Sequence, residues 1–187
     1  MVAELPKTAH ERSTAIQLLD GVDRLIGLIC KSVVQSTGVV LLFAIIIGVV
    51  ARYVIDVGGV DWAEELPKQL YSWFIMAGVV LALQHGNHIA VDLIYNVLPK
   101  TGRQVLIVLS NLLLCGAYLY LFLIALDVAE IAAAETNPML GTPNSLPFYA
   151  LAGGALLTAV GALSIALRVF LLGPEARPQG AAEESVV

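Results

Sequence analysis

Hydrophobic residues along the chain gather in long runs, separated by short polar connections. The runs cover residues 38–51, 70–83, 105–126 and 146–172. The third and fourth are long enough as helices to cross about 30 Å of hydrocarbon, which takes about 20 residues. The first two reach that length when their flanks are included. The pattern therefore predicts an all-α membrane protein with four transmembrane helices. We expect these helices over about 33–53, 66–85, 104–126 and 146–172.

The segments that flank these helices are more polar. Residues 1–32 are expected to form a cytoplasmic N-terminal tail, with a helix that begins at Ser13 or Thr14. One face of this helix is apolar and the other carries Asp20, Asp23 and nearby basic residues, a pattern typical of an amphipathic helix on a membrane surface. The alternative is an extension of the first transmembrane helix, and the pattern does not decide between the two. Residues 173–187 are expected to be a disordered cytoplasmic tail.

The composition agrees with a membrane protein. Hydrophobic residues make up 58% of the chain and charged residues 13%, with a mean hydropathy of +0.84. A soluble domain of this size needs more polar surface. The net charge of −5 is modest and the sequence has no basic run, so no binding to nucleic acid is expected.

The distribution of Lys and Arg predicts the orientation. All of them except Arg52 and Lys68 fall in the N-terminal segment, the second connection or the C-terminal region that begins at Arg168. Cytoplasmic loops are rich in Lys and Arg, so both termini are predicted to be cytoplasmic. The first and third connections, which contain several Asp and Glu residues, are then on the outer side.

Two histidines and an aspartate after the second helix are a candidate metal site. On one continuous helix His85, His88 and Asp92 would share a face and provide metal ligands. Gly86 instead suits a helix end, and the asparagine after it suits the start of another helix. We therefore expect a bend, followed by a short cytoplasmic surface helix that Pro99 stops and that a local His88–Asp92 interaction supports.

Other catalytic chemistry is not indicated. No charged residue lies at the midpoint of a predicted spanning helix, and no Ser-His-Asp, Cys-His, P-loop or zinc motif occurs. An enzyme, a resident cofactor and a metal are therefore not expected. One alternative is a haem-binding membrane anchor of an oxidoreductase, with His85 or His88 as a ligand and an axial partner from another subunit. A small self-assembling exporter is a third hypothesis, but it would typically need an acidic residue inside a spanning helix.

The last predicted helix carries small residues at four-residue spacing. They are Ala150, Gly154, Thr158, Ala162 and Ala166. Small residues allow transmembrane helices to approach closely. The ridge is suited either to packing within a four-helix bundle or to docking a partner subunit, and both interpretations stay open.

Three local patterns together resemble a known family. The first helix ends in "ARYVID" and leads into "DWAEEL"; the second ends in "ALQHGNHIAVDLIYNVLP"; the third connection contains "TNPMLGTP". In this combination the chain resembles, over roughly residues 33–170, the DctQ-like small membrane subunit of tripartite ATP-independent periplasmic (TRAP) transporters. The matching positions are Arg52 and Tyr53; Trp62, Glu64 and Glu65; Gly86, His88, Val91 and Asp92; Pro99; and Leu140, Gly141 and Pro143. The sequence departs from the family after Pro143, where Asn144 stands in place of a frequent Trp.

The resemblance implies a non-catalytic scaffold in the bacterial inner membrane. In such transporters a DctP-like periplasmic binding protein delivers the solute, and a large DctM-like permease holds the substrate and sodium sites. The small subunit is then expected to lie in the lipid bilayer, brace the large subunit and help dock the binding protein in sodium-coupled uptake of organic acids or similar solutes. Glu64 and Glu65 are candidate docking residues on the outer side, or simply an acidic first helical turn. His88 and Asp92 hold the bend or contact the large subunit.

Overall fold

The structure is a computed structural model, and it describes residues 7–55, 62–85 and 99–173. These residues form α1 (Lys7–Val50), a π-helical turn η1 (Ala51–Ile55), α2 (Trp62–Gln84), α4 (Lys100–Ala132) and α5 (Leu146–Leu172). All four α-helices are long and apolar enough to cross a membrane. The prediction of four long apolar helices is confirmed, and α5 has the predicted bounds.

The first helix is longer than predicted. The sequence suggested either a separate amphipathic helix from residue 13 or an extension of the first spanning helix, and α1 runs without a break from Lys7 to Val50. No proline lies between these two residues, so no backbone N–H of the helix is missing. Residues 13–32 therefore continue the first spanning helix. At its far end the helix widens into η1, which contains Arg52.

The second helix begins at Trp62, before the start expected at about residue 66. Pro67 lies inside it, in the second turn. A proline is tolerated best near a helix start, where few backbone hydrogen bonds are lost. The short surface helix expected after Gln84 lies outside the described residues, as do the tails 1–6 and 174–187.

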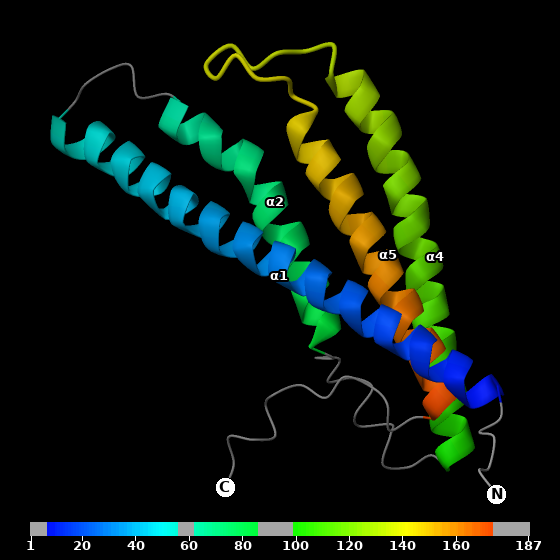
Figure 1. Cartoon of the computed structure of the whole chain (residues 1–187). Helices are drawn as coiled ribbons and strands as arrows, with labels where there is room; N and C mark the ends of the chain where they lie inside the picture. The colour runs from blue at the N-terminus through cyan, green and yellow to red at the C-terminus, as the bar shows by residue number, and fades with distance from the viewer. Residues whose placement is uncertain (1–6, 56–61, 86–98, 174–187) are drawn as a thin grey trace, which may run out of the picture.

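The helices form a row in the order α1, α2, α5, α4 rather than a closed bundle (Figure 1). α2 packs against α1 on one side and α5 on the other, α4 packs against α5, and α1 touches α5 over a short stretch only. In Figure 1 the helices converge where α2 and α5 end and spread apart at the opposite end. We call the first of these the Arg168 end, after a residue near the end of α5. We call the other the loop end, because the loop between α4 and α5 lies there.

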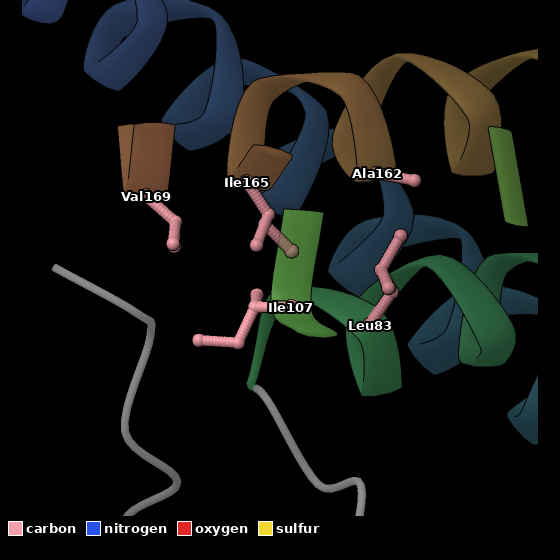
Figure 2. Close-up of a cluster of buried hydrophobic side chains, with 5 residues drawn as sticks. All are labelled: Leu83, Ile107, Ala162, Ile165 and Val169. Atoms are coloured by element: carbon pink, nitrogen blue, oxygen red, sulfur yellow. The ribbon is translucent and has the colours of Figure 1, made fainter. Parts of the chain in front are cut away.

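Two groups of buried apolar side chains hold the row together. One joins α2, α4 and α5 near the Arg168 end and consists of Leu83, Ile107, Ala162, Ile165 and Val169 (Figure 2). The other joins α1 to α2 and consists of Ile26, Cys30, Ala77 and Val80. α2 and α5 contribute to the packing on two sides, which makes them the inner helices of the row.

The small residues of α5 are buried within this row. Ala150, Thr158, Ala162 and Ala166 are each at most 4% exposed, and Gly154 is also buried. A Cβ atom at position 154 would lie 2.5 Å from Cβ of Met76 on α2, a distance that real Cβ atoms essentially never show. The Thr158 hydroxyl donates to the Gly154 carbonyl at 2.8 Å, so it brings no unpaired polar group into the interface. The ridge therefore packs between helices of this chain. Of the two interpretations of the ridge, internal packing is the one that the structure supports.

Large apolar side chains cover the outer surface of α1 and α4. Exposed examples are Leu42, Phe43 and Ile46 on α1 and Leu109, Leu113 and Tyr120 on α4. Monomeric soluble proteins rarely expose apolar patches of this extent. The exposed surface of the row is therefore suited to lipid or to another membrane protein.

Adding one methyl group to Gly154 is expected to destabilise the row. In Gly154→Ala the new Cβ meets Cβ of Met76, which is fixed to the backbone, so α2 and α5 must separate. Overpacking of this kind costs about 1–3 kcal/mol. Gly153→Ala is the matched control, since nothing lies within 4 Å of its Cβ position. Thermal unfolding in detergent measures the difference, and equal midpoints for the two variants would contradict the close contact.

Candidate functional site

At the loop end, the start of α2 lies close to the end of the first helix. The Arg52 guanidinium lies 3.9 Å from a carboxylate oxygen of Glu64, and it lies over the Tyr53 ring at 5.8 Å from the centroid. The side chains of Arg52 and Glu64 are 69% and 63% exposed, so this ion pair contributes little to stability. Trp62 is also exposed at the first position of α2. These four candidate residues therefore form an accessible surface at one end of the row.

Glu65 has a different environment from Glu64. One carboxylate oxygen forms an ion pair with Lys68 at 2.5 Å, and the other accepts a hydrogen bond of 3.0 Å from the Asn137 side-chain amide. Asn137 belongs to the loop between α4 and α5 and is buried. Glu65 therefore connects α2 to this loop, a structural contact that the sequence did not predict.

Asn137 also organises the loop from within. Its side-chain Oδ1 accepts hydrogen bonds from the backbone N–H groups of Met139 and Leu140, and its backbone N–H donates to the Thr142 carbonyl. The N–H of Gly141 donates back to the Asn137 carbonyl. Gly141 has φ +63°, a conformation that residues with a Cβ rarely adopt. The loop is irregular, as predicted, but hydrogen bonds hold it in one shape, and its tip exposes Met139.

At the Arg168 end, one arginine bridges two carboxylates of α1. Arg168 binds Oδ1 of Asp20 and Oδ2 of Asp23, each at 2.8 Å, and its side chain is only 20% exposed. The Ser164 hydroxyl donates to the same Asp23 oxygen at 2.9 Å. This cluster fixes α1 against α5, where the two helices otherwise touch little.

The sequence analysis missed this cluster. It assigned Asp20 and Asp23 to the polar face of an amphipathic helix and Arg168 to the basic residues of the C-terminal region. Two acids at i and i+3 share one face of a helix, and Arg168 is the last charged residue of the final apolar run. Opposite charges near the ends of two antiparallel helices were the available signal, but the sequence does not show which ends meet.

Gln84 completes the junction at this end. Its side-chain amide donates to the Asp23 carbonyl of α1 at 2.9 Å. A Cβ at Gly27 would lie 2.8 Å from Oε1 of the same glutamine, so the glycine leaves room for Gln84 to lie across α1. The last residue of α2 is thereby joined to the same turn of α1 that Arg168 binds.

The remaining candidates divide into two groups. Gly154 and Ala162 are packing residues inside the row, whereas Gly86, His88 and Asp92 lie outside the described residues. His85 is described, and its Nδ1 lies 2.7 Å from the Leu81 carbonyl. Over the ranges 7–55, 62–85 and 99–173, no three His, Cys, Asp or Glu side chains gather in a way that suits a metal ion.

Removing the Arg168 guanidinium is expected to destabilise the fold. Arg168→Gln leaves two partly buried carboxylates without their cation, and hydrogen bonds to charged groups contribute about 1.5–3 kcal/mol each. Arg168→Lys retains the charge but loses the bidentate geometry, so an intermediate loss is expected. Lys31→Gln, a change at an exposed position of α1, is the control for altered charge. An unfolding midpoint for Arg168→Gln equal to that of the control would mean that the bridge does not stabilise the protein.

Comparison with known proteins relates this geometry to a family. A sequence profile described as "Tripartite ATP-independent periplasmic transporters, DctQ component" matches residues 41–172, which include α2, α4, α5 and the end of α1. The N-terminal part of α1, with Asp20 and Asp23, lies outside the match.

Individual relatives agree with the profile. "Uncharacterized protein y4mM" of Sinorhizobium fredii is 40% identical over 164 residues, which cover 88% of this chain but only 30% of the relative. This chain thus spans less than a third of that protein's length. Two proteins of Haemophilus influenzae are each named "Putative TRAP transporter small permease protein". One is 24% identical over 65% of this chain and 71% of its own length. The other is 21% identical over 74% of this chain and 84% of its own length. The family match favours the transporter interpretation over the haem anchor, and the chain belongs to the DctQ component family of tripartite ATP-independent periplasmic transporters.

Proposed function

We propose that this chain is the non-catalytic small permease subunit of a sodium-coupled, binding-protein-dependent TRAP transporter for organic acids or similar solutes. It braces a large DctM-like permease in the bacterial inner membrane, with both of its termini in the cytoplasm. At its loop end it helps to dock a DctP-like periplasmic binding protein. Family membership supports the transporter role, while the partners, the solute and the sodium coupling are part of the proposal.

The observation that carries the scaffold role is the placement of charge. The stretches 32–51, 69–84, 104–126 and 146–167 contain no Asp, Glu, Lys or Arg. Binding sites for ions and polar solutes inside a membrane usually need such residues or unwound helices. Over those four stretches the backbone is α-helical, except that Ala51 begins the π-helical turn η1. A chain of this kind is poorly suited to hold a solute by itself and well suited to support a partner that does.

The row architecture supports the same role. α1 and α4 each have one packed side, and their other sides expose long apolar surfaces. An open row of four helices offers a partner a broader contact face than a closed bundle of the same length. A large permease seated on this face would cover apolar surface that is otherwise left to lipid.

The loop end supports a docking role. Glu64 is exposed, and the loop tip with Met139 is held in one shape by Asn137. A preformed surface costs less ordering entropy on binding than a flexible one. A soluble protein that meets the transporter from this side would contact both features.

Stable assembly with a large permease is the first expected outcome. When the chain is produced together with the DctM-like subunit of the proposed transporter, the two should purify as one complex. In liposomes, sodium-driven uptake should require this complex and the binding protein, and either membrane subunit alone should be inactive. Uptake by this chain alone would contradict the scaffold role.

Reversing the charge of Glu64 or Glu65 at the loop end is expected to weaken uptake more than it weakens membrane insertion. Glu64→Lys removes only an exposed ion pair, so a several-fold loss of uptake in this variant would indicate a lost contact with the binding protein. Glu65→Lys also removes the bond to Asn137 and should weaken uptake further by loosening the loop. Uptake in liposomes and the amount of protein in the membrane fraction are compared. Equal losses of uptake and membrane protein would indicate misfolding instead.

A further inference from the structure

A cavity of about 420 Å³ opens beside the Arg168 cluster, between α1, α2 and α5. This volume is within the range of small-molecule pockets, roughly 300–1,000 Å³. Its polar lining includes Asp20, Arg24, His85 and Arg168, and Gly27, Gly161 and Ile165 provide apolar wall. It lies where α2 and α5 end, at the expected boundary between hydrocarbon and headgroups.

The charged residues that line the cavity differ in how many partners each one has. Arg168 is already shared between two carboxylates, and Asp23 receives a second hydrogen bond from Ser164. Asp20 uses one carboxylate oxygen for Arg168, and its side chain remains 41% exposed. Arg24 is exposed and forms no ion pair with any residue in the described part of the chain. As far as the described residues are concerned, the cavity therefore presents one available cation, Arg24, and one partly available carboxylate, Asp20.

We propose that this cavity binds the headgroup of phosphatidylethanolamine, with the lipid phosphate at Arg24 and the primary ammonium at Asp20. A purely anionic headgroup or free phosphate would meet the negative field of Asp20 and Asp23 beside Arg24. A zwitterion places each of its charges next to the opposite charge on the protein. The acyl chains leave along the apolar wall at Gly161 and Ile165, toward the exposed surface of the row.

The choice between ethanolamine and choline headgroups follows from hydrogen bonding. A primary ammonium has N–H donors for the carboxylate oxygen of Asp20 that does not bind Arg168, whereas a quaternary ammonium has none. Quaternary ammonium groups are usually held by aromatic rings, and no Phe, Tyr or Trp is among the described residues that line this cavity. Phosphatidylcholine, with the same net charge, is therefore expected to bind more weakly.

Native mass spectrometry of the full chain in detergent tests the proposal. The protein is mixed with equal amounts of phosphatidylethanolamine, phosphatidylcholine and phosphatidylglycerol that share the same acyl chains. We expect one ethanolamine lipid per chain, retained several-fold more than the other two. Preference for phosphatidylglycerol, or equal retention of all three, would overturn the proposal. Displacement by glycerophosphoethanolamine, which lacks acyl chains, as effective as that by the intact lipid would also overturn it, in favour of a soluble ligand.

Variants locate the bound lipid. Arg24→Gln should reduce retention of phosphatidylethanolamine several-fold, and Arg24→Lys should restore most of it. Lys31→Gln is the matched control, because Lys31 is exposed on the same helix but does not line the cavity. The Arg24 side chain is exposed, so the fold should survive its replacement. Equal retention in Arg24→Gln and Lys31→Gln would place the lipid elsewhere. The measurement needs no transport partner, so its outcome is independent of the proposed function.

Discussion

The close approach of α2 and α5 at Gly154 is the constraint on which the rest of the structure depends. With no side chain at this position, Cβ of Met76 fits against the α5 backbone, and the small residues that follow every four positions continue the same seam. In a membrane, helices gain little from burying apolar surface, since lipid is equally apolar. Close packing of small residues therefore decides which helices become neighbours. Here it makes α5 an inner helix of the row, with α2 on one side and α4 on the other.

Polar contacts at both ends complement this apolar seam. At the loop end Glu65 and Asn137 join α2 to the loop, and at the Arg168 end the arginine joins α5 to α1. The Arg168 contact links α1 and α5, which otherwise touch over a short stretch only. At the edge of a membrane such pairs are only partly screened by water, so they contribute more than fully exposed pairs do. Polar contacts thus stabilise the row at its two ends, and close apolar packing stabilises it between them. The outer faces of α1 and α4 are apolar and can contact lipid or a partner.

Much of the fold and part of the candidate site were predictable from the sequence. The apolar runs gave four helices, with bounds that were closest for α5, where the run itself begins and ends sharply. The loop with Gly141 was recognised as irregular, and the family was recognised from short motifs. The start of α1 was left open, because an amphipathic surface helix and the polar end of a long spanning helix share one periodicity. Glu65 was identified as a candidate, but its contact with Asn137 was not.

Hydropathy and length by themselves determined that this chain is a membrane protein with four long apolar helices, because the bilayer sets both requirements locally. Only the tertiary structure decided the order of the helices in the row, the burial of the small-residue ridge and the partners of Asp20, Asp23 and Arg168. The contacts of Asp23 with Ser164 and Arg168 join residues more than 140 positions apart in the chain, and the contact of Gly154 with Met76 joins two different helices. A periodic pattern specifies which face of a helix is apolar or charged, but not which other helix will meet that face.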